Sequence, residues 1–133
     1  MTNPTKHFRK RDAILTYLHG TKLHPSADMV YAELKPKIPD LSLGTVYRNL
    51  SMFRQQGTIA SLGTVNGVER FDGNPQPHVH FVCRQCHAVL DMPELSVPKE
   101  LVKKAEGQIE AVVSGCSLTF TGQCRRCKGG ETA

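Results

Sequence analysis

The chain has 133 residues, of which 39% are hydrophobic and 6% aromatic, and carries a formal net charge of +5. This length suits one domain of ordinary size or two small ones. Since no apolar run approaches the ~20 residues of a membrane helix and the first residues are unlike a signal peptide, we expect a cytoplasmic protein with no membrane partner. In that compartment the five cysteines are more typical of metal ligands than of disulfides.

The positive charge is concentrated in the first half of the chain. Residues 1–73 contain ten Lys/Arg against six Asp/Glu, a net +4, whereas residues 74–133 contain seven against six, a net +1. The surplus therefore lies in the half that has no cysteines. A surplus of this size permits nucleic-acid binding without requiring it.

Three helices are predicted in the first 57 residues. The first spans residues 7–19, with Gly20 as its C-cap. The second begins after the N-cap candidate Ser26 and ends before Pro36, so that His24 lies in the loop before it. The third runs from Ser42 to residue 57. Its apolar residues recur at the spacing of a buried stripe: Leu43, Val46, Leu50 and Phe53.

A β-hairpin is predicted directly after the third helix. Its strands, at residues 58–65 and 68–72, flank Asn66-Gly67, the strongest short turn signal. Three helices followed by a two-stranded ribbon form a winged helix-turn-helix, whose third helix enters the major groove of DNA. Because Pro and Gly follow the hairpin, we expect a DNA-binding domain at 1–73, a hinge at 74–77 and a second domain at 78–133.

The outer face of the third helix carries the candidate DNA contacts. Its side chains donate hydrogen bonds or contact thymine methyl groups, and few are carboxylates that phosphates would repel. An ordinary amphipathic helix with a polar outer face is the commoner explanation of such a pattern, but its position as the third helix before a hairpin favours DNA binding. The candidates are Ser42, Thr45, Tyr47, Arg48, Asn49 and Arg54.

The second domain is predicted to be small and of mixed α/β type. Short strands are expected at residues 88–92, 110–114 and 117–122, with a helix that has Pro98 in its first turn. The predicted fold class of the whole chain is therefore α+β, a winged helix-turn-helix followed by a small α/β domain. Because the second domain has few apolar residues, both zinc binding and dimerisation would help it to fold.

Two C-x-x-C pairs provide the most specific motif. Cys83, Cys86, Cys124 and Cys127 have the spacing of a structural Cys₄ zinc site, in which two tight turns direct four thiolates at one ion. Unrelated thiols or a redox pair are the weaker alternatives. Residues 83–87 also match the C-x-x-C-H pattern of c-type haem attachment, but haem would leave the second pair unexplained. Cys116 has no partner and is more typical of a small packed residue than of a ligand.

A second metal site is suggested by His78 and His80. In an extended segment these two side chains point to the same face. Together with His24, Asp72 and Asp91 they offer nitrogen and oxygen donors that suit Fe²⁺, Mn²⁺ or Zn²⁺. Spacing alone supports only the two histidines of the H-x-H pair, because each aspartate is equally explained by a capping or turn role at a strand end.

Six segments together resemble the ferric uptake regulator (Fur) family, and most of all its peroxide-sensing PerR branch. They are H-P-S-A-D-M-V-Y (24–31), S-L-G-T-V-Y-R-N-L (42–50), R-F-D (70–72), H-V-H-F-V-C-R-Q-C (78–86), V-L-D (89–91) and C-R-R-C (124–127). The resemblance covers residues 11–127. It implies a homodimeric repressor, not an enzyme, with a winged helix that binds double-stranded operator DNA and a dimerisation domain held by structural Zn²⁺.

The resemblance also implies a regulatory site for Fe²⁺ or Mn²⁺ at His24, Asp72, His78, His80 and Asp91. Ligands from both domains would fix the angle between the two recognition helices of the dimer. In the peroxide-sensing branch, Fe²⁺ reacts with H₂O₂ and a ligand histidine gains oxygen, here His24 or His78, whereas Mn²⁺ supports repression without that reaction.

Three residues favour the peroxide-sensing branch. Asp91 occupies a position where iron-sensing relatives tend to have glutamate, and Pro77 and Val79 replace a His and an Asp found in them. A regulator that senses the concentration of iron, manganese or zinc without peroxide chemistry is the alternative within the family. A zinc-ribbon redox or haem protein that does not bind DNA is the alternative outside it. The chain departs from the family in its short N-terminus and in Cys116, where relatives often have histidine.

Overall fold

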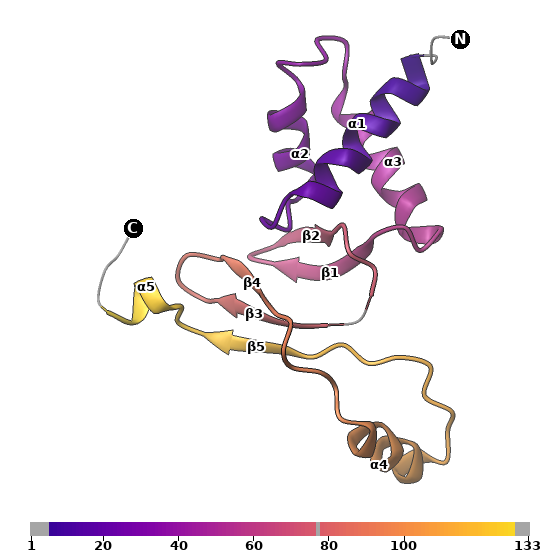
Figure 1. The fold of residues 1–133 in the computed structure, drawn as a ribbon, viewed down its shortest axis with the longest axis vertical. Coiled ribbons are helices and arrows are strands. Elements are labelled where there is room, and N and C mark those ends of the chain that lie inside the picture. Colours follow the sequence, from indigo (N-terminus) through magenta and orange to yellow (C-terminus); the bar gives the residue numbers. More distant parts are fainter. Residues whose placement is uncertain (1–5, 77, 130–133) are drawn as a thin grey trace. The chain divides into compact units, whose positions relative to one another are not determined.

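A computed structural model of the protein describes residues 6–76 and 78–129 (Figure 1). The chain divides into two compact units, Met1–Pro75 and Gln76–Ala133. The hinge at 74–77 stays a prediction, and its last residue, Pro77, lies outside the described residues. In the described part of the chain, no helix is long and apolar enough to cross a membrane.

The first unit contains the three predicted helices, which are confirmed: α1 (Lys6–Gly20), α2 (Ala27–Leu34) and α3 (Leu43–Gln55). Two serines begin the last two of them. The Oγ of Ser26 accepts the Met29 amide at 3.2 Å, and the Oγ of Ser42 accepts the Thr45 amide at 3.1 Å. These bonds satisfy amides that the first helical turn leaves without partners, as the sequence predicted.

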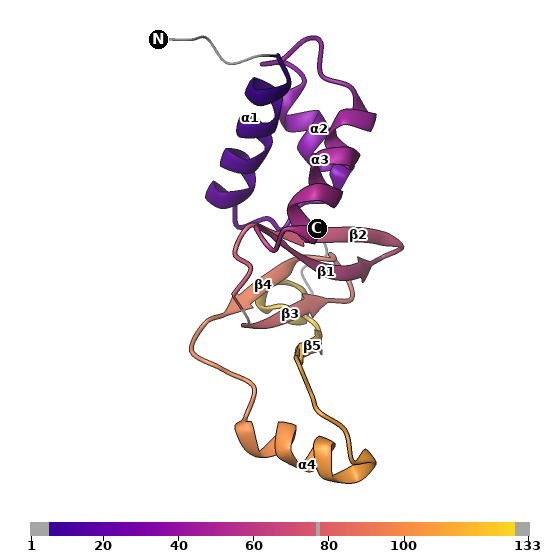
Figure 2. The same ribbon diagram turned by 90° about the vertical axis from the view of Figure 1, so that its right-hand side faces the viewer.

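A hairpin completes the first unit. Its strands β1 (Ala60–Val65) and β2 (Val68–Asp72) pair antiparallel across Asn66 and Gly67, which have φ values of 52° and 79°. These left-handed values fit the tight turn that the Asn-Gly pair predicted. The first strand begins at residue 60 and not at 58. All views place the three helices on one side of the hairpin, the arrangement of a winged helix (Figures 1 and 2). Apolar residues of the helices and the hairpin form a common core: Ile14, Leu18, Val30, Val46, Leu50, Phe53, Ile59 and Phe71.

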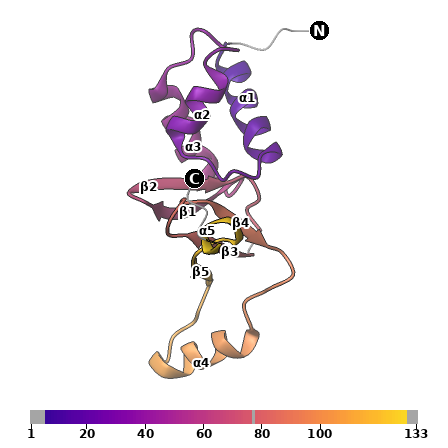
Figure 3. The ribbon, with the colours of Figure 1, turned by 90° about the vertical axis from the view of Figure 1, so that its left-hand side faces the viewer.

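The second unit is built on a three-stranded sheet. Its strands are β3 (Val79–Cys83), β4 (Val89–Met92) and β5 (Thr119–Gly122), in the order β4-β3-β5. The central strand β3 pairs antiparallel with β4 and parallel with β5. A short helix, α5 (Arg125–Lys128), follows β5 directly (Figure 3). The motifs had not predicted this helix.

The helix α4 (Lys99–Ile109) lies apart from the sheet of its unit and is joined to it by two extended segments (Figures 1 and 2). Pro98 is its N-cap, and Glu110 ends it in a left-handed conformation with φ 50°. No residue of α4 is buried, although the helix contains large apolar side chains: Leu101 is 48% exposed and Ile109 is 72% exposed. The helix thus keeps an apolar face for which the described part of this unit offers no covering surface.

The prediction of a strand at residues 110–114 is wrong. Residues 111–118 have no regular secondary structure, and Val112 is 88% exposed. A strand needs a neighbouring strand to satisfy its backbone groups, and none of the strands described for this chain runs beside this segment. Its Val113 amide instead donates to a carboxylate oxygen of Glu106 at 3.0 Å. The strand predicted at 117–122 is confirmed in a shorter form, as β5.

Candidate metal centres

The parallel pairing of β3 with β5 brings the two C-x-x-C motifs to the same edge of the sheet. Cys83, the last residue of β3, lies opposite Gly122, the last residue of β5. The Arg84 amide donates to the Gly122 carbonyl at 2.8 Å, so the segments after β3 and β5 remain adjacent where they leave the sheet. Cys124 then begins α5, whose single turn carries Cys127 back toward β3.

The four thiols form one cluster. The Sγ atoms of Cys83, Cys86, Cys124 and Cys127 all lie within 4.8 Å of one another, and those of Cys86 and Cys124 are 3.8 Å apart. A tetrahedral zinc ion with Zn–S bonds of about 2.3 Å separates its sulfurs by about 3.8 Å. Disulfide sulfurs would be about 2.05 Å apart, and all five cysteines are free. The cluster therefore fits a zinc ion and not a disulfide.

Hydrogen bonds and burial divide the thiols into two kinds. The amides of Cys86 and Cys124 each donate to Cys83 Sγ at 3.4 Å and lower the pKa of the Cys83 thiol to about 5. The amide of Cys127 likewise lowers the pKa of Cys124. Burial, with the sulfurs of Cys124, Cys83 and Cys86 around it, raises the pKa of Cys127 to about 12. A cation that takes all four sulfurs therefore displaces a proton from Cys127.

The position of Cys83 bears on the haem alternative. Its side chain is fully buried, and its sulfur is occupied by two amides. Attachment of a macrocycle requires an accessible sulfur, so the geometry favours a small ion over haem.

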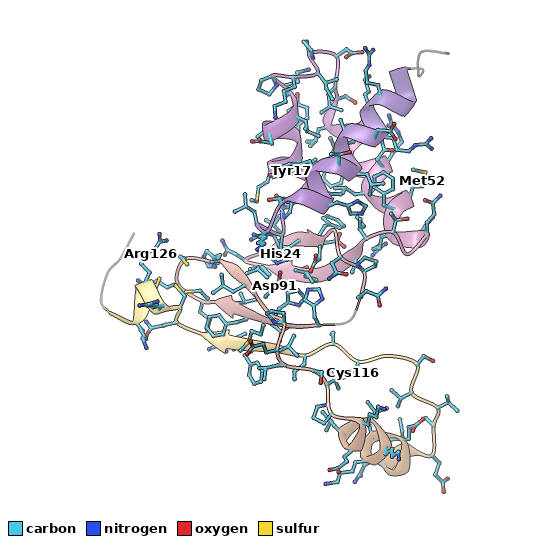
Figure 4. All side chains as sticks on the ribbon, in the orientation of Figure 1. Tyr17, His24, Met52, Asp91, Cys116 and Arg126 are labelled. Carbon is cyan, nitrogen blue, oxygen red and sulfur yellow. The ribbon has the colours of Figure 1, made fainter. Side chains whose placement is uncertain are left out.

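The expectation that Cys116 is a packed residue is wrong. The side chain is exposed, in the segment that follows α4 (Figure 4). It borders an open pocket of about 340 Å³ that is also lined by His78, Val102 and Val113. Cys116 lies in a segment that forms no strand, and it does not belong to the four-thiol cluster.

In the second unit, His78, His80 and Asp91 lie together. His80 is opposite Asp91 in the register of β3 and β4. One oxygen of Asp91, Oδ1, lies 3.2 Å from Nε2 of His78 and 3.2 Å from Nε2 of His80. The two ring centroids are 4.3 Å apart, as expected for side chains on the same face of a strand.

The orientation of the His78 ring is fixed by a backbone group. Its Nδ1 lies 2.7 Å from the carbonyl oxygen of Gln76. A carbonyl accepts only, so Nδ1 is the donor in this hydrogen bond, and Nε2 is the ring atom left to bind a metal. A metal-binding histidine is typically held in this way by a second hydrogen bond.

In the first unit, His24 and Asp72 form a pair. His24 lies in the loop before α2 (Figure 4), and its Nδ1 is 3.5 Å from Oδ2 of Asp72, the last residue of β2. The other oxygen of Asp72 accepts the Asn74 amide at 2.8 Å. These two residues offer one imidazole and one carboxylate, a donor set without thiolate that suits Fe²⁺ or Mn²⁺ as well as Zn²⁺.

One residue beside this pair was not singled out from the sequence. Arg70 donates from Nε to the carbonyl of His24 and from Nη2 to that of Leu23 at 2.8 Å. Burial lowers the pKa of its guanidinium. The signal was available, because Arg70 and Asp72 are two residues apart on one strand and so share a face.

The candidate DNA contacts differ in their exposure and in the contacts that they already make. Ser42 caps α3, and the Asn49 side-chain amide donates to the Thr45 carbonyl at 2.9 Å. Tyr47 is 52% exposed, and Arg48 is exposed with one hydrogen bond to Thr45 Oγ1 at 3.1 Å. Arg54 is also exposed and pairs with Glu69 of the hairpin at 3.7 Å. Tyr47 and Arg48 are therefore the side chains best placed to extend from α3.

Comparison with known proteins places this geometry in a family. The model of the ferric uptake regulator family matches residues 3–120. The peroxide-responsive repressor PerR of Staphylococcus aureus is 33% identical over 121 residues, which cover 90% of this chain and 80% of that protein.

Two solved structures are similar over most of their length. The peroxide stress regulator of Campylobacter jejuni has a TM-score of 0.75 and 29% identity, covering 92% of this chain and 91% of that chain. The iron-containing ferric uptake regulator of Francisella tularensis has a TM-score of 0.75 and 25% identity, covering 96% and 95%. The match to the family model and the identity to PerR together show that this chain belongs to the ferric uptake regulator family.

Proposed function

We propose that the protein is a metal-dependent transcriptional repressor that senses hydrogen peroxide. The family makes it a metal-responsive regulator, and the proposal includes no enzymatic activity. The observation that carries the finer proposal is the convergence of His78 and His80 on one oxygen of Asp91. This set of donors has no thiolate and is therefore less biased toward zinc than the four-cysteine cluster.

The four-cysteine cluster is proposed to hold a structural zinc ion. Such sites have four protein ligands and no open position, so they stabilise a fold and do not react with substrates. The second unit needs this contribution because its buried apolar residues are few, among them Val79 and Val89.

The regulatory ion is proposed to take its ligands from both units. His24 and Asp72 of the first unit supply two donors, and His78, His80 and Asp91 of the second supply three. Fe²⁺ and Mn²⁺ prefer more ligands than either group offers alone. An ion held by both groups restricts the hinge, which raises the fraction of molecules in the geometry that binds operator DNA.

Peroxide is proposed to act on a ligand histidine. Bound Fe²⁺ supplies the redox chemistry that activates H₂O₂. One peroxide oxygen is added to a ring carbon of His24 or His78 and the other leaves as water, so the residue gains one oxygen atom. The oxidised ring is a poorer ligand, and loss of the ion releases the hinge and then the DNA. The names of the similar proteins in S. aureus and C. jejuni, both peroxide regulators, support this proposal.

Sensing of iron concentration is the second candidate, and the likeness to the iron-containing F. tularensis regulator favours it. The two are separated by treating the Fe²⁺-loaded protein with one equivalent of H₂O₂ without oxygen. A gain of one oxygen in the peptide of His24 or His78 is expected, with none in the Mn²⁺-loaded control. Unmodified peptides together with intact DNA binding would leave metal sensing as the function.

The ligand assignment is tested by gel shift with operator DNA, with and without Mn²⁺. His24→Ala and Asp91→Ala are expected to lose the stimulation by Mn²⁺ while each retains one zinc per chain. His19→Ala, which changes a histidine of the first unit outside the proposed set, serves as the matched control. Loss of zinc from the first two variants would show that the ligands have been divided incorrectly.

A further inference from the structure

We infer that Arg70 is a positioning residue for the metal ligand His24, since its guanidinium holds the backbone conformation that presents the imidazole beside Asp72. The inference rests on the proposed regulatory site and adds a residue outside its ligand set. It depends only on contacts within the first unit.

The backbone of His24 has an unusual conformation. Its φ is 50°, in the left-handed region that residues other than glycine rarely occupy. The next residue is Pro25, and a residue before proline is normally extended. Histidine enters this region more readily than most residues other than glycine, but a following proline favours an extended backbone, so contacts from elsewhere in the fold must hold the left-handed conformation.

Those contacts come from β2. Arg70 donates to the carbonyls of Leu23 and His24, and the amide of Phe71 donates to the carbonyl of Pro25 at 2.9 Å. Three consecutive carbonyls of the loop are thus bound by two consecutive residues of one strand. The same strand ends in Asp72, whose Oδ2 is 3.5 Å from His24 Nδ1. A single strand therefore sets the position of the aspartate and, through Arg70, that of the histidine.

The shape of the arginine side chain matters in this role. A guanidinium carries five N–H groups in a rigid plane, so it donates to two neighbouring carbonyls in fixed directions. A lysine ammonium carries the same charge on a flexible stem without that geometry. The charge of Arg70 and its positioning role predict opposite changes in metal affinity when the residue is replaced, because a cation beside a metal site repels the metal. Removal of Arg70 would then tighten metal binding, whereas loss of positioning weakens it.

The test measures Mn²⁺ affinity by electron paramagnetic resonance in the full-length, zinc-loaded protein. Arg70→Met is expected to weaken Mn²⁺ binding about ten- to a hundredfold, the usual effect of removing a residue that orients a ligand. Arg70→Lys is expected to remain weaker than the wild type although it keeps the charge. In both variants the visible spectrum of Co²⁺ at this site should change, while zinc content stays at one per chain.

Two further variants make the result specific. Lys37→Met removes an equal charge from the same unit without touching the loop at His24, since Lys37 pairs with Glu33, and its Mn²⁺ affinity should not fall. His24→Ala should bind Mn²⁺ weakly. If His24→Ala does bind weakly but the Mn²⁺ affinity of Arg70→Met or Arg70→Lys equals or exceeds that of the wild type, the positioning role is overturned. If His24→Ala itself binds Mn²⁺ normally, the proposed site is wrong.

Discussion

Asp91 shows how closely three candidate ligands of the second unit converge. One of its oxygens lies 3.2 Å from an imidazole nitrogen of both His78 and His80. The Gln76 carbonyl holds the opposite nitrogen of His78 at 2.7 Å. Because the rings are already oriented, an ion that replaces these hydrogen bonds requires little rearrangement of the strand.

The cysteines give the first prediction for single residues. Cys127→Ser removes one sulfur from the four-thiol cluster, and because a structural site needs all four ligands, the variant should lose its zinc and much of its structure in the second unit. Atomic emission after dialysis and circular dichroism measure the two effects. Cys116→Ser is the matched control, since Cys116 lies outside the cluster, and it should retain one zinc. Equal zinc in both variants would contradict the assignment.

The second prediction for single residues concerns the outer face of α3. Arg48→Ala should weaken binding to operator DNA by about 1–3 kcal/mol at fixed Mn²⁺ and salt concentration, if its guanidinium contacts a base edge. Asn49→Ala should have a smaller effect, because the Asn49 amide already donates to the Thr45 carbonyl within the helix. Fluorescence anisotropy with labelled operator measures both. Arg84→Ala, which removes a charge from the second unit, is the control, and an Arg48 variant no weaker than this control would contradict the prediction.

Among the elements, the contact between α1 and Gly73, the residue after β2, is tight. A Cβ atom added to Gly73 would lie 2.2 Å from the carbonyl oxygen of Leu18 and 2.9 Å from the amide nitrogen of His19. Only glycine fits at this point, so the position of Asp72, the preceding residue, depends on it.

Gly73→Ala should therefore destabilise the protein. Because the backbone must shift to admit the methyl group, a loss of about 1–3 kcal/mol in the free energy of unfolding is expected. Urea denaturation followed by circular dichroism measures it. Gly20→Ala, at the end of α1, is the matched control, since an added Cβ there meets nothing within 4 Å. A Gly73 variant as stable as this control would contradict the prediction, because it would show that the backbone of α1 can shift at little cost.

The elements also show where sequence patterns succeed. The helices α2 and α3 were predictable because Ser26 and Ser42 cap them and their apolar residues repeat with the helical period. The hairpin was predictable from Asn66-Gly67. In the second unit, the apolar residues 111–113 predicted a strand that does not form, because alternation and β-propensity describe a strand but do not supply its neighbour. The helix α5 has four residues, too few for a periodic pattern.

At the scale of the whole molecule, the exposed apolar side chains of the second unit fit a homodimer. Those of the segment from β4 to β5 include Leu95, Leu101, Ile109, Val112 and Phe120, each at least 45% exposed. An amphipathic helix with no buried residue normally covers its apolar face with another surface. Since regulators of this family are dimers, a second copy of the chain is the proposed partner.

Ile109→Asp should weaken this dimer. A carboxylate placed in an apolar interface loses its hydration without gaining a partner, so sedimentation equilibrium should show a larger fraction of monomer at the same concentration. Leu23→Asp is the control, because Leu23 is an exposed apolar residue of the first unit. Equal masses for the two variants would place the interface elsewhere.

The candidate sites were partly readable from the sequence. The spacing of the cysteines predicted a common cluster, and the alternation of a strand predicted that His78 and His80 share a face. The approach of Asp91 to both rings depends on the register between β3 and β4, which no local pattern fixes. The role of Arg70 depends on backbone carbonyls 46 and 47 residues earlier in the chain, and backbone acceptors leave no trace in the residue types.

The strand β3 has only five residues, yet Cys83 ends it and His80 lies within it. Side chains alternate along a strand, so a slip of one residue against β4 or β5 would turn both imidazoles to the opposite face. The proposed binding of one ion by Cys83 and the cysteines after β5 would prevent such a slip. The proposed zinc ion would thus contribute to metal sensing indirectly. Although it does not contact the regulatory site, it would fix the strand register that keeps His78 and His80 on the face where they can bind the regulatory ion.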